Sequence, residues 1–202
     1  MYKKLSKKIT NHFINKQIIS KEDREIYEYS YEVLLAESVY IFMMIVIGLL
    51  FHAFIASLFF FIGFYLCRKV SGGYHASTYT KCHILFAMNH ILFIGLSKFI
   101  PQNLYWIITL VFVGISIVLI YFLAPIDHPN KPFDEHEHKK YKRQSRVFIL
   151  ITLLATVVLY MVERNNPYYF YVSIGIFSAS MSLLYSFFER RKKHEKNQKL
   201  YG

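Results

Sequence analysis

Six long apolar segments constrain the fold of this chain more than any other feature of its sequence. They run over 33–51, 53–66, 84–100, 104–123, 147–162 and 168–188. A helix of about 20 apolar residues crosses the hydrocarbon core of a bilayer, and the short second segment needs tilt or help from its flanks. With 54% hydrophobic residues and a mean hydropathy of +0.29, the chain is too apolar for a soluble domain of this size. We therefore expect an all-α, polytopic membrane protein with about six transmembrane helices.

The basic residues predict the orientation of these segments. Of the 24 Lys and Arg, only Lys98 and Arg164 lie outside the N-terminal region, the loop after the second segment, the loop before the fifth and the C-terminal end. Cytoplasmic loops collect Lys and Arg, so both termini and the loop 68–82 are expected in the cytoplasm. Topology thereby explains the formal net charge of +11 without a nucleic-acid partner. Residues 1–32 lack the apolar core of a signal peptide, and we expect the N-terminus to be retained.

The chain is interpreted as a single integral membrane domain over 1–202, with three parts. In the first part, 1–19, Tyr2, Leu5, Ile9 and Phe13 recur at helical spacing opposite several lysines. This pattern is typical of an interfacial helix on an anionic lipid surface, with a solvated basic tail as the alternative. The second part, 20–188, is the helical membrane bundle. The third part, 189–202, is a basic cytoplasmic tail.

The loop 68–82 lies between the second and third segments and holds the residues best suited to chemistry. Cys82 is the candidate nucleophile, because nearby positive charge favours the reactive thiolate. His75 is the candidate general base and later acid, since imidazole changes protonation near neutral pH. The two lie seven residues apart, which would place them on one face of a helix, but Gly72-Gly73 argues against a helix just before His75. A tight turn there would instead bring backbone amides to a substrate carbonyl.

Each of these residues also has a structural interpretation. Free cysteines are often small buried fillers, and a His after two glycines is more often an ordinary loop residue. Cys67 is a rival nucleophile beside Arg68, but it has no His next to it in sequence. Packing is therefore the better interpretation of Cys67.

A proline-rich stretch before the fifth segment is the second unusual loop. Pro125, Pro129 and Pro132 fix an extended path, and between them lie Asp127 and Lys131. Asp127 is a candidate third catalytic member that orients His75, or a ligand for a basic peptide; a plain helix stop is the alternative. Three histidines lie nearby, namely His128, His136 and His138. Their spacing matches no closed zinc pattern, so we expect no metal site and no cofactor.

Three polar residues lie inside apolar segments, where they usually face a bundle interior or a cavity. For Asn89 and His90 we predict interhelical hydrogen bonds. Glu37, nearer the cytoplasmic edge, is a candidate contact for the basic loop residues or for a substrate.

Taken together, Arg68, Gly72-Gly73, His75 and Cys82 closely resemble the accessory gene regulator protein B family of bacterial quorum-sensing peptidases. The length, the basic amphipathic N-terminus, the six segments and the Pro-x-Asp-x-Pro-x-Lys-Pro loop are also similar. The resemblance implies a membrane cysteine endopeptidase, in which Cys82 is the nucleophile and His75 its partner. Arg68 and Gly73 fall at family positions that activity requires.

The resemblance further implies the substrate and the product. The enzyme would cleave a small precursor peptide at its C-terminal side through a Cys82 thioester, and promote cyclisation to a thiolactone or lactone autoinducer. Family precursors are expected to combine an amphipathic helix with an acidic tail, which the basic cytoplasmic surface would attract; a homodimer is also plausible. Two alternatives stay open, namely a non-catalytic transporter lined by Glu37, Asn89 and His90, and a membrane-surface scaffold.

Overall fold

The computed structural model describes residues 2–73, 78–127, 133–162 and 167–201, with side chains up to residue 192 in the last range. Within these ranges the backbone is helical and contains no β-strand beyond one isolated bridge. The elements are α1 Tyr2–Asn15, α2 Arg24–Leu50, α3 Phe54–Ser71, α4 Tyr79–Ser97, η1 Gln102–Leu104, α5 Tyr105–Leu123, α6 Glu135–Val162 and α7 Tyr168–Tyr201. The all-α expectation is confirmed.

Five helices of the described chain are long and apolar enough to cross a membrane by length and composition: α2, α3, α5 together with η1, α6 and α7. Their outward faces carry large apolar side chains that would be costly to expose to water and are well placed against lipid. On α5 alone these exposed residues include Ile107, Leu110, Val111, Ile115, Val118 and Phe122. The chain is therefore a multi-pass membrane protein.

Helix α4 corresponds to the third apolar segment but is not among these five. It is 19 residues long, and its apolar sequence is interrupted by Lys81, His83, Asn89 and His90. These polar side chains lower the hydropathy that a spanning helix needs. The structure thus supports five of the six predicted spans, and a sixth crossing by α4 stays a prediction.

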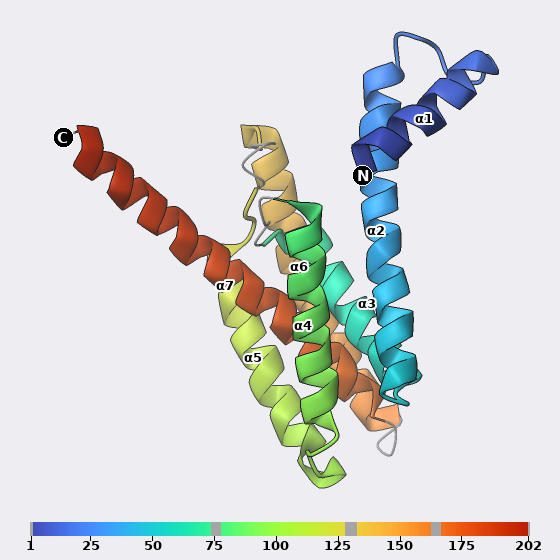
Figure 1. Ribbon diagram of the computed structural model, residues 1–202. Helices are drawn as coiled ribbons and strands as arrows, with labels where there is room; N and C mark the ends of the chain where they lie inside the picture. Colours follow the sequence, from blue (N-terminus) through green and yellow to red (C-terminus); the bar gives the residue numbers. More distant parts are fainter. Residues whose placement is uncertain (1, 74–77, 128–132, 163–166, 202) are drawn as a thin grey trace.

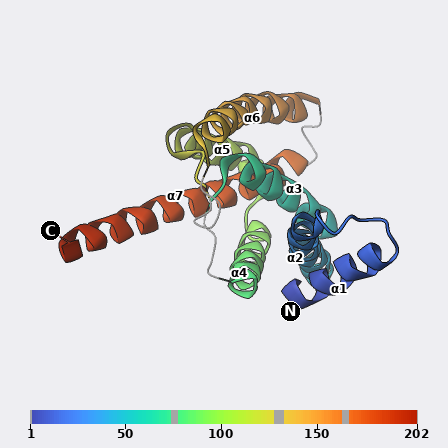
Figure 2. The same cartoon turned by 90° about the horizontal axis from the view of Figure 1, so that it is seen from above.

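Helices α3 and α7 form the centre of the bundle (Figures 1 and 2), with α5 and α6 on one side and α2 and α4 on the other. Two glycines let the central pair approach closely. A Cβ added at Gly63 would lie 2.3 Å from the carbonyl oxygen of Val172, and one at Gly175 would lie 2.1 Å from that of Phe60. Small residues at such crossings allow backbone contact, which drives helix association in membranes.

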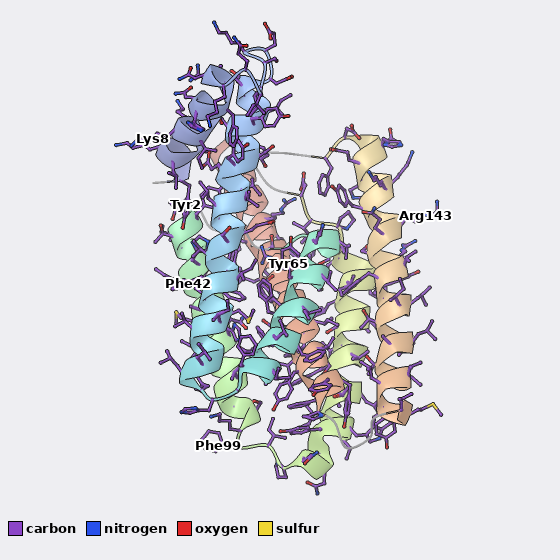
Figure 3. The ribbon with its side chains drawn as sticks, turned by 90° about the vertical axis from the view of Figure 1, so that its right-hand side faces the viewer. Tyr2, Lys8, Phe42, Tyr65, Phe99 and Arg143 are labelled. Atoms are coloured by element: carbon purple, nitrogen blue, oxygen red, sulfur yellow. The ribbon has the colours of Figure 1, made fainter. Side chains whose placement is uncertain are left out.

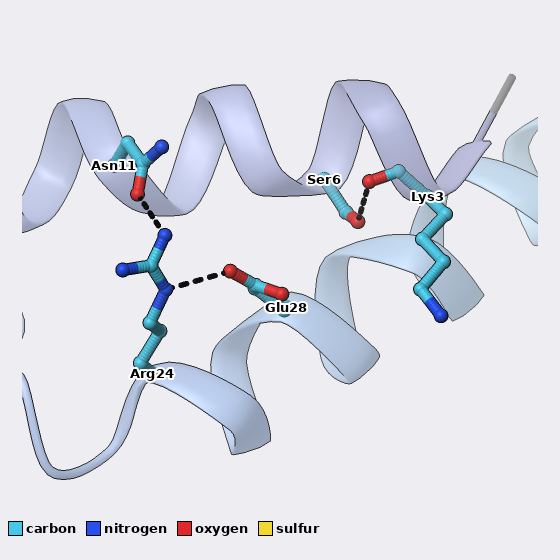
Figure 4. A network of polar contacts seen from close by, with 5 residues as sticks. All are labelled: Lys3, Ser6, Asn11, Arg24 and Glu28. Atoms are coloured by element: carbon cyan, nitrogen blue, oxygen red, sulfur yellow. Dashed lines mark hydrogen bonds and ion pairs between the residues drawn. The ribbon is translucent and has the colours of Figure 1, made fainter.

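Helix α1 packs across the start of α2. Figure 4 shows the junction, where Arg24 donates to Asn11 Oδ1 at 2.6 Å and to Glu28 Oε1 at 2.8 Å. The buried face of α1 consists of Ser6 and Thr10, whereas Leu5 is 43% exposed. The predicted helix at the N-terminus is therefore present, although it ends at Asn15, and its small polar residues contact α2.

The ends of the helices fall into two groups. Figure 1 places both chain termini toward the same end of the bundle. Lys8 and Arg143 lie toward that end in Figure 3, and Phe99 lies at the opposite one. Helix α7 continues without interruption from its apolar part through the basic C-terminal stretch to Tyr201.

Candidate functional site

A cavity of about 830 Å³ lies between α2, α3, α4 and α7, and Cys82 contributes to its wall. Pockets of about 300–1,000 Å³ are typical of ligand sites. Most of the wall is apolar, built largely by phenylalanines and leucine, while Glu37, Arg68, Lys69 and Asn89 supply polar groups. The candidate nucleophile is thus partly exposed to a space large enough for a short peptide segment.

Cys82 lies in the first turn of α4. The turn is capped by Thr78, whose side chain accepts a hydrogen bond from the backbone N–H of Lys81 at 3.3 Å. Thr78 itself has extended backbone angles, so no continuous helix joins His75 to Cys82 and the seven-residue helical spacing does not apply. A helix N-terminus carries partial positive charge, which adds to that of Lys81 beside Cys82 and of Arg68 in the same cavity wall.

Tyr40, on α2, packs beside the nucleophile's turn, because its ring meets that of His83, the residue after Cys82, edge-on with 4.5 Å between centroids. Sequence reasoning missed Tyr40. One signal was available, because Tyr40 follows Glu37 by three residues and therefore shares its helix face. Both residues line the cavity.

His83, next to Cys82 in sequence, is turned away from the cavity and is only 3% exposed. Its Nε2 lies 3.0 Å from the carbonyl oxygen of Ala36, and its Nδ1 lies 3.3 Å from the Tyr2 hydroxyl. A carbonyl only accepts, so Nε2 carries a proton and donates it to Ala36. Both ring nitrogens are thereby engaged in joining α4 to α1 and α2.

Arg68 extends from the end of α3 into the cavity wall. Its Nη1 donates to Ser182 Oγ on α7 at 2.9 Å, and its guanidinium lies 5.7 Å from the centre of the Phe64 ring. Gly73 lies against the same pair, because a Cβ there would be 2.8 Å from Ser182 Oγ and 3.3 Å from Arg68 Nη1. The structure therefore brings Arg68 and Gly73 together, and adds Ser182, which lies too far along the chain for any sequence motif to include it.

The proline-rich loop is attached to the end of α3. Gly72 and Ile126 form a parallel bridge, with Ile126 N–H donating to the Ser71 carbonyl at 3.1 Å. Gly72 has φ +75°, and a Cβ there would lie 2.0 Å from the Ile126 carbonyl oxygen. Only glycine fits at this position, so the first glycine of the pair is required by the fold.

Asp127 follows this bridge and contacts Arg190 of α7, with Oδ1 and Nη1 2.6 Å apart. Its Oδ2 also accepts from the backbone N–H of Phe133 at 3.3 Å. Partial burial opposes ionisation, but the hydrogen bond and charge of Arg190 and the Phe133 N–H hold the pKa of Asp127 below its ordinary value. The carboxylate is thus held at the same end of α3 as Arg68.

Glu37 lines the cavity beside the basic residues, and its Oε2 accepts from the Tyr65 hydroxyl at 3.4 Å. The two predicted interhelical hydrogen bonds are confirmed. Asn89 Oδ1 accepts from Ser178 Oγ of α7 at 2.5 Å, and His90 Nε2 lies 2.6 Å from Ser57 Oγ of α3. The Asn89 contact joins α4 to α7 about two turns along α4 from Cys82, and Asn89 also lines the cavity.

Cys67 has no exposed surface and belongs to an apolar cluster with Ile120, Ile149 and Leu183. Its sulfur lies 3.7 Å from Ser71 Oγ. The packing interpretation of Cys67 is confirmed.

His75 and Lys131 lie outside the described residues, as does His128 of the histidine group. Among the residues that are described, no three His, Cys, Asp or Glu side chains gather as metal ligands would. His136 and His138 lie on the first turns of α6.

The sequence is similar to one known family over most of its length. The family model described as Accessory gene regulator B matches residues 6–184. A putative AgrB-like protein of Clostridium perfringens is 30% identical over 173 residues, covering 82% of this chain and 80% of the relative. The accessory gene regulator protein B of Staphylococcus lugdunensis is 27% identical over 147 residues, covering 72% and 74%, and that of Staphylococcus haemolyticus is 29% identical over 147 residues, covering 71% and 73%. No solved structure matches the chain.

Proposed function

Because this chain belongs to the accessory gene regulator B family, we propose that it is a membrane cysteine endopeptidase that processes a small precursor peptide for quorum sensing. The observation that carries the proposal is the position of Cys82, which is partly exposed in the wall of a cavity that also holds Arg68. The buried Cys67 offers no such access.

The proposed reaction begins with the Cys82 thiolate attacking a peptide carbonyl. The electron pair of sulfur forms the S–C bond, and the carbonyl π electrons move to oxygen. When the intermediate collapses, the C–N bond breaks and His75 gives the leaving amine the proton that it took from the thiol. The C-terminal piece of the precursor departs, and an acyl thioester remains on Cys82.

Cyclisation follows if a nucleophilic side chain of the bound peptide attacks this thioester. A peptide thiol exchanges one thioester for another, so the activated acyl bond is kept and a thiolactone forms; a hydroxyl would give a lactone. Water has to be excluded, since hydrolysis would release a linear acid. The apolar side chains of α3, α4 and α7 around the cavity support such exclusion.

The precursor is proposed to bind through its charge as well as its shape. Arg68 and Lys69 stand in the cavity wall, and with Lys131 they would attract an acidic segment beyond the cleaved bond. Glu37 stands in the same wall and is proposed to contact the substrate or the basic residues. Asp127 is proposed as an orienting group for His75. Its carboxylate already pairs with Arg190, so this role has to be tested against a purely structural one.

Mass spectrometry of the purified protein incubated with its precursor peptide tests the proposal. We expect an acyl adduct on Cys82 that hydroxylamine removes, as it removes thioesters. Cys82→Ser and His75→Ala should each abolish cleavage without loss of membrane insertion. Cys67→Ala is the matched control, because it deletes the other thiol and leaves the cavity wall unchanged.

Cleavage by Cys82→Ala membranes, or an adduct only on Cys67, would contradict the peptidase. The transporter alternative predicts peptide flux that thiol alkylation leaves unchanged.

We further propose that α4 is the sixth crossing and that both termini and the active-site loop face the cytoplasm. Both chain ends lie toward one end of the bundle (Figure 1), and Lys8 and Arg143 lie there too (Figure 3). Alkaline phosphatase fusions after Ser97 and after Tyr201 test this topology: the first should be active outside the cell and the second inactive. Crosslinking in membranes tests the predicted homodimer.

A further inference from the structure

Asn89 lines the cavity that holds Cys82, and only one side of its amide is bonded to the protein. Ser178 Oγ of α7 donates to the amide oxygen, Oδ1, at 2.5 Å. The NH2 group keeps two donors, and within the part of the chain that the structure describes no protein group accepts from them. Because Asn89 is partly exposed, these donors are available to a molecule in the cavity.

Cys82 and Asn89 lie on the same face of α4, since the seven residues that separate them make two turns of a helix. Both line the cavity. Two turns span about 10.5 Å, and an extended peptide rises about 3.3 Å per residue. A peptide lying along this face with its attacked carbonyl at Cys82 would therefore reach Asn89 about three residues from that bond.

The contacts with α7 indicate which part of the peptide reaches Asn89. Arg68 is bonded to Ser182, whereas Asn89 is bonded to Ser178, one helical turn further from the C-terminal end of α7. The cationic group is thus nearer the end of the bundle where both termini lie (Figure 1), and the amide is nearer the other end. If Arg68 attracts the acidic segment that departs, the segment that stays on Cys82 runs toward Asn89.

The wall along this path is largely apolar, and Leu85 and Phe86 lie on α4 between Cys82 and Asn89. A peptide segment there loses water from its main-chain carbonyl groups, and a buried carbonyl without a donor is costly. The NH2 group of Asn89 can supply one such donor without placing a charge in the cavity.

We propose that Asn89 is a substrate-binding residue, whose NH2 group donates to a main-chain carbonyl of the precursor about three residues before the cleaved bond. The proposal rests on the proposed function and adds a binding contact to the same site. Ser178 is a positioning residue in this arrangement, because its hydroxyl holds the amide oxygen and leaves the NH2 group to the cavity.

Binding of precursor peptides to the Cys82→Ala protein in detergent tests the proposal without turnover. Esters replace, one at a time, the peptide bonds about two to four residues before the cleaved bond, because an ester carbonyl is a weaker acceptor than an amide carbonyl. We expect one ester to weaken binding to Cys82→Ala and to bind Cys82→Ala with Asn89→Leu as well as the all-amide peptide does. Asn89→Leu should itself weaken binding of the all-amide peptide about 5–150-fold, the effect of leaving a buried carbonyl unpaired.

Ser178→Ala in the same background is the matched control. It breaks the same hydrogen bond between α4 and α7 but keeps the NH2 donors of Asn89. It should weaken binding less than Asn89→Leu and remain sensitive to the ester. The unfolding temperature of each variant in detergent separates a loss of affinity from a loss of fold.

Two outcomes would overturn the role of Asn89. One is that every ester weakens binding equally with and without Asn89→Leu, and the other is that Ser178→Ala and Asn89→Leu lose binding equally. Either result leaves the peptidase intact as long as Cys82→Ala is inactive. Cleavage by Cys82→Ala would instead overturn the proposed function itself.

Discussion

Arg190 binds both the side chain and the backbone of Asp127. Its Nη1 lies 2.6 Å from Oδ1 of the carboxylate, and its Nη2 donates to the Asp127 carbonyl oxygen. Together with the Gly72–Ile126 bridge, this contact ties the segment after α5 to the end of α3 and to the side of α7. The aspartate that the sequence suggests for orienting His75 thus already has a structural role.

Asp127 should stabilise the protein in a pH-dependent way. A carboxyl with a pKa below its ordinary value adds stability above its unfolded pKa of about 3.9, and that stability is lost as the pH falls through the lower folded value. Because Arg190 is 44% exposed, solvent limits the effect to about 1 kcal/mol. Thermal unfolding in detergent should show wild type above Asp127→Asn at neutral pH, with the difference shrinking below about pH 4. A constant difference down to about pH 3 would contradict this assignment.

The catalytic and structural roles of Asp127 predict different kinetics. If the carboxylate orients His75, Asp127→Asn should lower the cleavage rate well beyond Arg190→Met, which breaks the same ion pair from the other side. If it only holds the loop, the two variants should lose activity equally. Cleavage rates of the two variants at matched stability decide between these roles.

Alanine at Gly73 should be less damaging when Ser182 is shortened. An added Cβ would press on Ser182 Oγ at 2.8 Å, and the backbone has φ +138°, which alone costs about 1–3 kcal/mol in a residue other than glycine. We expect Gly73→Ala to reduce cleavage, and Gly73→Ala with Ser182→Ala to recover part of it.

Gly72→Ala provides the contrast to this rescue. Its Cβ would meet the Ile126 backbone oxygen at 2.0 Å, so Ser182→Ala should recover nothing there. If Ser182→Ala restored cleavage equally in the Gly73→Ala and Gly72→Ala proteins, Ser182 would not be what limits the space at Gly73.

Asn89 and Ser178 should be energetically coupled across α4 and α7. Hydrogen bonds between membrane helices average about 0.6 kcal/mol and reach about 1.7 kcal/mol, and the 2.5 Å Oγ–Oδ1 distance places this pair toward the upper part of that range. A double-mutant cycle of Asn89→Ala and Ser178→Ala, followed by unfolding in detergent, measures the coupling. Additive single effects would mean that the two side chains act independently.

Gly63 and Gly175, at the crossing of α3 and α7, should each tolerate alanine poorly. Alanine at either position presses a Cβ onto a backbone carbonyl, and overpacking of this kind typically costs about 1–3 kcal/mol. Gly114 of α5 is the matched control, because a Cβ there has no atom within 4 Å. Gly114→Ala should leave the unfolding temperature unchanged or raise it, and a comparable loss at all three positions would contradict the packing argument.

Much of the fold was predictable because apolar length alone identifies helices in lipid. The predicted segment 104–123 corresponds closely to α5, and the predicted start at residue 168 is that of α7. The start of α6 was not predictable from hydropathy. This helix begins at Glu135, twelve residues before the apolar segment, because charged residues continue a helix in water as readily as apolar ones do in lipid.

The candidate site was predictable only where its residues lie close together in the chain. Arg68, Gly73 and Cys82 belong to one loop and its flanking helix ends, so a local motif identified them. Tyr40 and Ser182 come from α2 and α7, and only tertiary packing brings them to that loop. Hydropathy also gave no reason to expect that α1 would bury Ser6 and Thr10.

The contacts that α4 makes have a consequence for biosynthesis. This helix carries Asn89 and His90, and the partner of Asn89 is Ser178 of α7, which is synthesised after α4. Ser182, which orients Arg68, comes from α7 as well. Until α7 has left the ribosome, the nascent chain holds the Cys82 thiol without a complete cavity wall. The cavity beside Cys82 is therefore completed only after α7 has been synthesised and has packed against α3 and α4.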